Sequence, residues 1–217
     1  EMNIPSHKNK SARNLILITT LFSIVYAIIR YNIFGTVPWK DLPLYVLNKG
    51  ISLSSLILLT ITFSLGPLKN MKVKISENFL NVRRPLGIAG FLLSFLHIFM
   101  SITILNPKYY KVFFMETGTL TIEGSLSLLG GILSFVFLWV YNTRFSSRIN
   151  EDEKIIALIT SRRFLIYAMF FTGIHLFFMG YKGWENISGW QAGLPPISLI
   201  SFIVFLIGFV INLFGRK

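Results

Sequence analysis

The sequence predicts an all-α membrane protein, a bundle of six transmembrane helices with both termini in the cytoplasm. Hydrophobic residues make up 53% of its 217 residues and charged residues only 14%, well below the roughly 25% of an ordinary soluble domain. The apolar residues come in long blocks, not at the 3.6-residue spacing of a helix with one wet face. Basic residues gather between these blocks. Together these observations exclude a soluble globular domain.

Blocks long enough to cross a bilayer can be placed six times along the chain. A hydrocarbon core of about 30 Å needs roughly 20 apolar residues in a helix. The first block follows a basic start and so resembles a signal peptide, but it is long for one and lacks a small-residue cleavage site. We therefore interpret it as a retained span. After a basic tail of residues 1–13, a single membrane domain over 14–217 is expected to hold spans 14–34, 43–66, 85–106, 120–141, 163–182 and 193–214.

Polar and small residues within two blocks mark special positions. Asn48 and Lys49 stand near the start of the second span. We place them at the membrane interface, where a lysine side chain reaches the headgroups. The fourth span opens with Glu123 and contains Gly130-Gly131.

The distribution of Lys and Arg gives the orientation. Of 21 basic residues, 15 lie on the side that holds both termini and the two long loops, and 6 lie on the other side. This excess places the first side in the cytoplasm of a multi-pass protein of the cell membrane. The net charge of +12 thus reflects orientation, and we exclude nucleic-acid binding. The loop 142–163, with a charged run at 151–154, is expected to be a short helix or a solvated linker.

Two of the three histidines lie deep inside apolar spans. His7 belongs to the basic tail, whereas His97 follows Arg84 by 13 residues and His175 follows Arg163 by 12 residues. At a rise of 1.5 Å per residue, the two lie about 20 and about 18 Å from the inner basic clusters. Both spans run in the same direction, so two parallel helices present an imidazole at one depth. A haem between two helices requires this arrangement, because its axial ligands approach the iron from opposite faces.

Haem b ligation by His97 and His175 competes with simpler roles. A lone polar residue in a transmembrane helix often only joins helices. A proton relay lacks an intramembrane acid as partner, and two histidines alone leave a transition ion under-coordinated. Haem supplies four further ligands itself, so it is the favoured cofactor, with a haem-free transporter or assembly subunit as the alternative. Gly87, Gly90 and Gly173 either make room for the macrocycle or let helices approach closely.

A series of landmark residues runs from the second to the sixth span. They are Asn48-Lys49, then Leu86-Gly87, Phe91 and His97, then His175, Trp184, Trp190 and Pro195-Pro196. Their order resembles that of the STEAP metalloreductases and the wider ferric-reductase-like transmembrane superfamily. The resemblance covers roughly residues 45 to 214, with low identity between the landmarks.

The resemblance implies a six-helix domain that binds one haem b through His97 and His175 near the outer face. In that family a flavin (FAD) at the inner side passes electrons from a nicotinamide to the haem, ferric or cupric ions are reduced outside, and the protein is a homotrimer. The NADPH-binding domain of STEAP reductases has no counterpart here, so a separate cytoplasmic flavoprotein or NAD(P)H-dependent donor is expected. Two-haem relatives need four histidines, which excludes a second haem.

A quinol- or partner-linked cytochrome b subunit is an alternative, although the extra histidine of MsrQ-type subunits is missing between Arg144 and Arg163. The depth of the histidines favours a carrier near the inner side, because a soluble donor would be far away. The inner arginines could bind flavin phosphates, above all Arg84 and Arg163, or act only as orientation anchors. They are Arg83, Arg84, Arg162 and Arg163. An outer rim could receive the acceptor or contact the haem propionates, or it could be only an interfacial aromatic belt; it comprises Tyr109, Tyr110, Lys182, Trp184 and Trp190.

Overall fold

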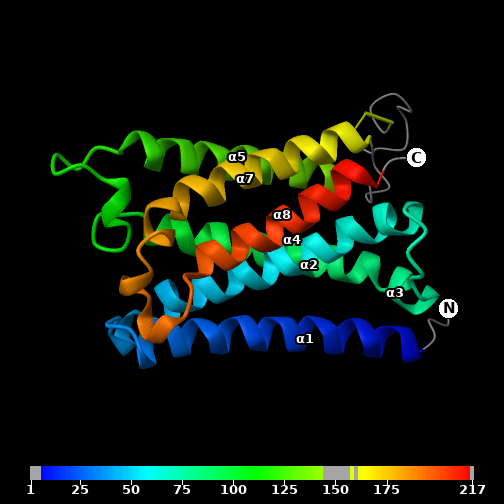
Figure 1. Cartoon of the computed structure of the whole chain (residues 1–217), viewed down its shortest axis with the longest axis horizontal. Coiled ribbons are helices and arrows are strands. Elements are labelled where there is room, and N and C mark those ends of the chain that lie inside the picture. Colours follow the sequence, from blue (N-terminus) through cyan, green and yellow to red (C-terminus); the bar gives the residue numbers. More distant parts are fainter. Residues whose placement is uncertain (1–5, 144–156, 159–160, 216–217) are drawn as a thin grey trace.

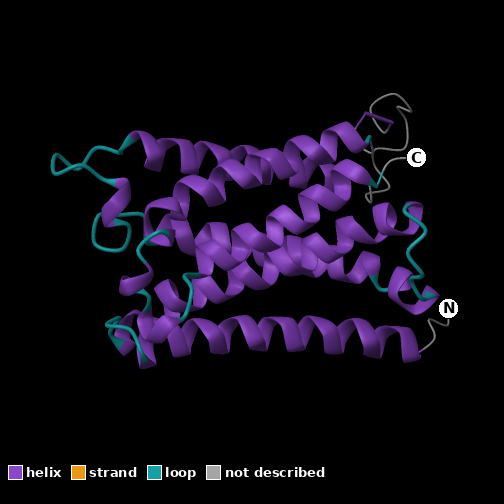
Figure 2. Ribbon diagram, in the orientation of Figure 1, coloured by secondary structure: helices purple, strands orange, loops and turns teal. Residues whose placement is uncertain are grey.

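Six long helices confirm the predicted fold class. The computed structural model describes residues 6–143, 157–158 and 161–215, and this part of the chain forms no β-sheet (Figure 2). All six helices are long and apolar enough to span a membrane. They are α1 (Ser6–Ile28), α2 (Leu47–Asn70), α4 (Arg83–Thr103), α5 (Ile122–Thr143), α7 (Arg162–Trp184) and α8 (Ile197–Phe214).

The helix bounds differ in detail from the expected spans. α1 begins at Ser6, inside the segment expected to be a basic tail, and continues as a π-helix over Ile29–Ile33. A short 3₁₀-helix, Trp39–Asp41, and a π-helix, Leu42–Val46, precede α2. A short helix, α3 (Glu77–Asn81), precedes α4. The charged run at 151–154, for which a helix or linker was expected, lies outside the described residues.

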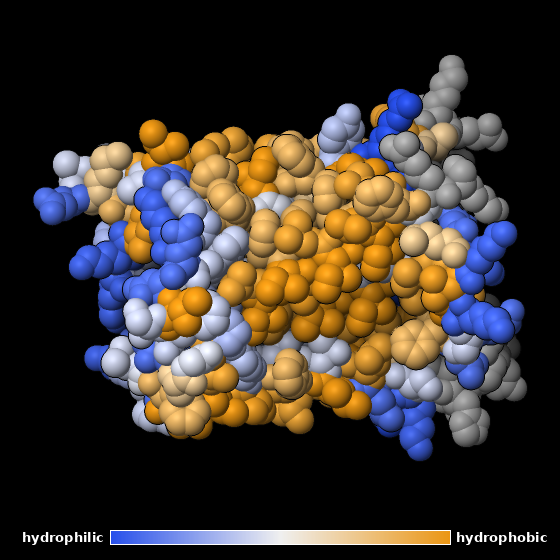
Figure 3. All heavy atoms as spheres, viewed as in Figure 1, coloured by the Kyte–Doolittle hydropathy of each residue, from blue (hydrophilic) through white to orange (hydrophobic). Residues whose placement is uncertain are grey.

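A broad apolar region covers the middle of the face shown in Figure 3. Figure 3 shows hydrophobic side chains over the centre and hydrophilic ones at both ends. On α1 alone, Leu17, Ile18, Leu21 and Phe22 are 59–65% exposed. A soluble protein rarely leaves such a continuous apolar face in water, so these side chains face lipid and the chain is a multi-pass membrane protein.

The helices form a ring of five, with α1 outside it. α2 packs against α1, α4 and α8, α7 packs against α5 and α8, and a lighter contact between α4 and α5 closes the ring. In Figure 1, α1 lies along the bundle beside α2, and the start of α1 and the end of α8 lie at the same end of the molecule. α4 and α7, which carry the two intramembrane histidines, are therefore not neighbours in the ring.

Small residues let the helices approach closely. A Cβ atom added at Gly90 would lie 2.9 Å from Leu59, and one at Gly173 would lie 2.5 Å from Phe205. Gly87 in α4 also faces α2, because a Cβ atom added there would lie 3.0 Å from the Thr62 side chain. Of the two roles considered for these glycines, the structure favours helix packing, which in lipid depends on such close contacts.

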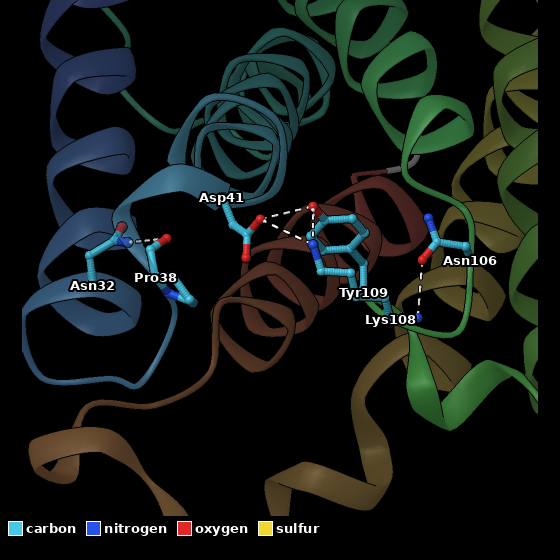
Figure 4. A network of polar contacts seen from close by, with 6 residues as sticks. All are labelled: Asn32, Pro38, Asp41, Asn106, Lys108 and Tyr109. Atoms are coloured by element: carbon cyan, nitrogen blue, oxygen red, sulfur yellow. Dashed lines mark hydrogen bonds and ion pairs between the residues drawn. The ribbon is translucent and has the colours of Figure 1, made fainter.

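Polar contacts tie the connecting segments together at the end opposite the chain termini. The Asp41 carboxylate accepts a hydrogen bond from the Tyr109 hydroxyl at 2.9 Å and lies 3.5 Å from the Lys108 ammonium (Figure 4). The main-chain N–H of Lys108 donates to the Asn106 side chain at 3.0 Å. The segment before α2 is thus fixed to the loop between α4 and α5.

Candidate functional site

The two intramembrane histidines lie side by side within the bundle. The ring centroids of His97, on α4, and His175, on α7, are 6.4 Å apart, and the ring planes are inclined by 68°. Both residues are partly buried. Two helices that do not pack against each other therefore bring their imidazoles together across the ring of helices.

Asn48 on α2 holds the His97 ring. The amide oxygen of Asn48 accepts a hydrogen bond from His97 Nδ1 at 2.7 Å, and the amide nitrogen donates to Ser101 Oγ at 2.9 Å. An amide oxygen is only an acceptor, so Nδ1 carries the proton and the lone pair of His97 is on Nε2. Asn48 is 2% exposed. Its two hydrogen bonds compensate for this burial.

The main chain of α5 holds the His175 ring. The carbonyl oxygen of Ser127 accepts a hydrogen bond from His175 Nδ1 at 2.9 Å, which again leaves the lone pair on Nε2. This contact requires α5 and α7 to approach very closely. A Cβ at Gly131 would lie 2.9 Å from His175 Nδ1, and one at Gly130 would lie 2.9 Å from the His175 backbone nitrogen. The glycine pair makes room for the histidine.

This donor set fits a haem iron. Both Nδ1 atoms are hydrogen-bonded, and within the described part of the chain neither Nε2 atom has a hydrogen-bond partner. Two metal–Nε2 bonds of about 2 Å each, with about 1 Å from each Nε2 to its ring centroid, would separate the ring centroids by about 6 Å, close to the observed 6.4 Å. The described residues contain no group of three or more His, Cys, Asp or Glu that could hold a metal ion alone.

The two sides of the histidine pair differ in chemistry. Toward the end of the bundle that holds the chain termini, an aromatic cluster of Phe91, Phe95, Phe135 and Trp139 joins α4 to α5, with ring centroids 5.6–6.4 Å apart. Toward the other end lie the polar groups of Asn48, Lys49 and Ser101, together with Tyr110. The site is apolar toward the chain termini, the end predicted to be the inner one, and polar toward the opposite end.

A cavity of about 350 Å³, called the inner cavity after the predicted orientation, opens at the end that holds the chain termini, between α2, α4 and α5. Its lining includes Arg83, Arg84, Phe91 and Tyr141. Phe91 precedes His97 by six residues, a rise of about 9 Å along the helix. The cavity thus reaches about halfway from the inner surface to the histidines.

The four inner arginines do not form one cluster. Arg83 Nε donates to the Thr62 carbonyl at 2.9 Å, and Arg162 Nη2 donates to the Asn212 carbonyl, so both are bound to neighbouring helices. Arg84 and Arg163 are exposed. They line separate cavities, because a second cavity, of about 540 Å³, contains Arg162 and Arg163.

Members of the expected outer rim also make structural contacts. The Lys182 ammonium lies 2.7 Å from the Glu123 carboxylate, which joins α7 to α5, and Trp184 Nε1 donates to Ser198 Oγ at 3.0 Å, which joins α7 to α8. Tyr110 lies beside Lys49 and Asn48. Burial raises the pKa of the Tyr110 hydroxyl, while the charge of Lys49 and hydrogen bonds with Ser101 and Asn48 act in the opposite direction.

The residues that orient the histidines could not be identified as partners from the sequence. Asn48 and the Gly130-Gly131 pair are visible as unusual residues in apolar spans, whereas Ser127 and Ser101 give no signal, since serine is ordinary in membrane helices.

Neither a protein-family model nor a curated protein matches this sequence. The likeness to STEAP metalloreductases therefore stands on its landmark residues alone.

Proposed function

We propose that the protein binds one haem b through His97 and His175 and carries electrons across the cell membrane, from a cytoplasmic donor to an outer acceptor such as a ferric or cupric ion. One observation carries this proposal: two imidazole rings inside the bundle, with centroids 6.4 Å apart and each Nδ1 hydrogen-bonded. The bound haem would supply a one-electron couple. Hydrogen-bonded Nδ1–H groups are usual for histidines that ligate metals.

The protein residues fix and shield the site. Asn48 and the Ser127 carbonyl orient the rings and select the tautomer with its lone pair on Nε2. The aromatic cluster of Phe91, Phe95, Phe135 and Trp139 would make the surroundings apolar on the side of the inner cavity, which Phe91 lines.

Electron entry would use the inner cavity. A flat-ring carrier there would be about halfway to the histidines, and Arg84 at the mouth would attract the phosphates of FAD. A quinol ring would suit the apolar part of the lining equally, so the protein would be either a ferric or cupric reductase, with a separate NAD(P)H-dependent donor, or the cytochrome b subunit of a quinol-linked complex. The excess of basic residues at this end supports its cytoplasmic orientation.

A haem-free packing role is the rival function, and one observation favours it. The His97–Asn48 bond joins α4 to α2, and the His175–Ser127 bond joins α7 to α5. Helix packing uses only Nδ1 of each ring. It does not account for two imidazole rings that lie side by side although their helices do not pack together.

Electron transfer by proteoliposomes tests the proposal. Purified protein would be supplied with haem and reconstituted around a trapped ferric chelate, and chemically reduced FAD would be added outside. We expect ferrous ion to form inside with the wild type and with His7→Ala, a matched control in the N-terminal tail, but not with His97→Ala or His175→Ala. Equal rates in all four proteins would contradict the proposal.

A further inference from the structure

Lys49 is a cation inside an apolar helix without an anionic partner. It follows Asn48 on α2, and its ammonium lies over the ring of Tyr45 at 4.5 Å and over the ring of Tyr31 at 5.1 Å. The ion pairs formed by the described residues are Lys108–Asp41 and Lys182–Glu123, and neither involves Lys49. Two tyrosine rings thus hold a charge that no carboxylate of the described residues neutralises.

The neighbouring cation is bound differently. Arg30 also lies against Tyr31, at 4.7 Å, but its Nε donates to the main-chain carbonyls of Leu194 and Pro195. Arg30 therefore has a structural role in fixing the start of α8. A lysine in a membrane span is costly, and contacts with aromatic faces offset only part of that cost. The Lys49 ammonium is thus contacted by two tyrosines, and no carboxylate of the described residues balances its charge.

The polarity of the site indicates which anion this is. The inner side of the histidine pair is aromatic, and the outer side carries Asn48, Lys49, Ser101 and Tyr110. A haem carries both of its carboxylates on one edge. A carboxylate buried among phenylalanine rings would be strongly disfavoured, so this edge belongs on the outer side. Lys49 lies on this outer side, one residue from Asn48, whose amide orients His97.

We propose, building on the proposed function, that Lys49 is the counter-ion of a haem propionate and thereby raises the reduction potential of the haem. Tyr31 and Tyr45 hold the ammonium in place. A fixed positive charge favours the reduced iron, because reduction adds a negative charge nearby.

Redox titration of the haem-loaded protein tests the assignment. We expect Lys49→Met to shift the ferric/ferrous equilibrium toward ferric by at least about tenfold, which is about 59 mV for a one-electron couple. Lys49→Arg keeps the charge and should stay close to the wild type. Lys108→Met removes the same charge from the same end of the molecule, at a side chain paired with Asp41, and should shift the midpoint far less. A Lys49→Met midpoint equal to that of the wild type, at normal haem content, would overturn the role of Lys49.

A second measurement needs no substitution. Wild-type protein is loaded with either haem b or its dimethyl ester, and release of each to apomyoglobin is timed. Release of the ester at least about tenfold faster supports a paired propionate, and equal rates overturn it. If the wild type binds neither form, the proposed function itself is wrong. This outcome is distinguishable from equal release rates, which contradict only the role of Lys49.

Discussion

The two halves of the histidine site meet the same requirement in different ways. On the α2–α4 side, a side-chain amide holds the ring: Asn48 Oδ1 lies 2.7 Å from His97 Nδ1. On the α5–α7 side, a main-chain carbonyl holds it: Ser127 O lies 2.9 Å from His175 Nδ1. The first half depends on the identity of one residue, and the second depends on how closely two helices approach. The two halves should therefore be sensitive to different substitutions.

The largest effect is expected on the α5–α7 side, from Gly131→Val. A Cβ at this position would lie 2.9 Å from His175 Nδ1, so valine would push the ring from its place and abolish haem binding. Gly183→Val is the matched control, because a Cβ at Gly183 meets nothing within 4 Å. The measurement is haem per protein, with circular dichroism to show that helices are retained. Normal haem content in Gly131→Val would show that helix approach does not position His175.

The next largest effect is expected on the α2–α4 side, from Asn48→Ala. Loss of the group that orients a metal-bound histidine typically weakens binding 10–100-fold, and we expect a haem dissociation constant raised by about that factor. Asn48→Asp keeps an acceptor for Nδ1–H and should restore binding. It should also lower the midpoint potential, since a carboxylate makes the imidazole a stronger donor. Equal weakening by both variants would mean that Asn48 acts only through packing.

Ser127→Ala should have only a small effect on haem binding. The substitution removes the hydroxyl that donates to the His175 carbonyl at 3.1 Å, but it leaves the Ser127 carbonyl in place. Loss of one such bond costs about 1 kcal/mol, so thermal stability should fall slightly and haem content should stay near that of the wild type. A defect as severe as that of Asn48→Ala would place the orienting group in the side chain instead.

The smallest effect on haem binding is expected from Arg84→Gln, because Arg84 belongs to neither half of the histidine site. Dithionite should reduce the haem as in the wild type, while reduction driven by FAD slows several-fold, because Arg84 lines the inner cavity. Arg163→Gln serves as the control, since Arg163 lines the other cavity. Stopped-flow absorbance measures both rates. Equal slowing by the two variants would argue against carrier binding in the inner cavity.

The sequence predicts the helices and the matched depth of the histidines because both follow from constant quantities, the bilayer thickness and the rise per residue. It could not predict that Asn48 faces His97 or that Gly131 makes room for His175, because these contacts depend on how neighbouring helices are rotated against each other. The π-helices at Ile29–Ile33 and Leu42–Val46 were missed as well, since single-turn changes in winding leave no hydropathy signal.

The arginines illustrate another limit of the sequence. The sequence offers four arginines as flavin contacts, above all Arg84 and Arg163, but does not show what each one touches. In the structure, Arg83 and Arg162 bind main-chain carbonyls of neighbouring helices. Charge counting predicts the side of the membrane but not which cations are already engaged.

The most direct test of a haem between His97 and His175 is a reduced-minus-oxidised visible spectrum of purified protein supplied with haem, recorded for the wild type and for each histidine-to-alanine variant. We expect the wild type to show a b-type spectrum with two histidine ligands and both variants to lose it. A wild type that stays colourless, or a spectrum that survives both substitutions, would contradict it.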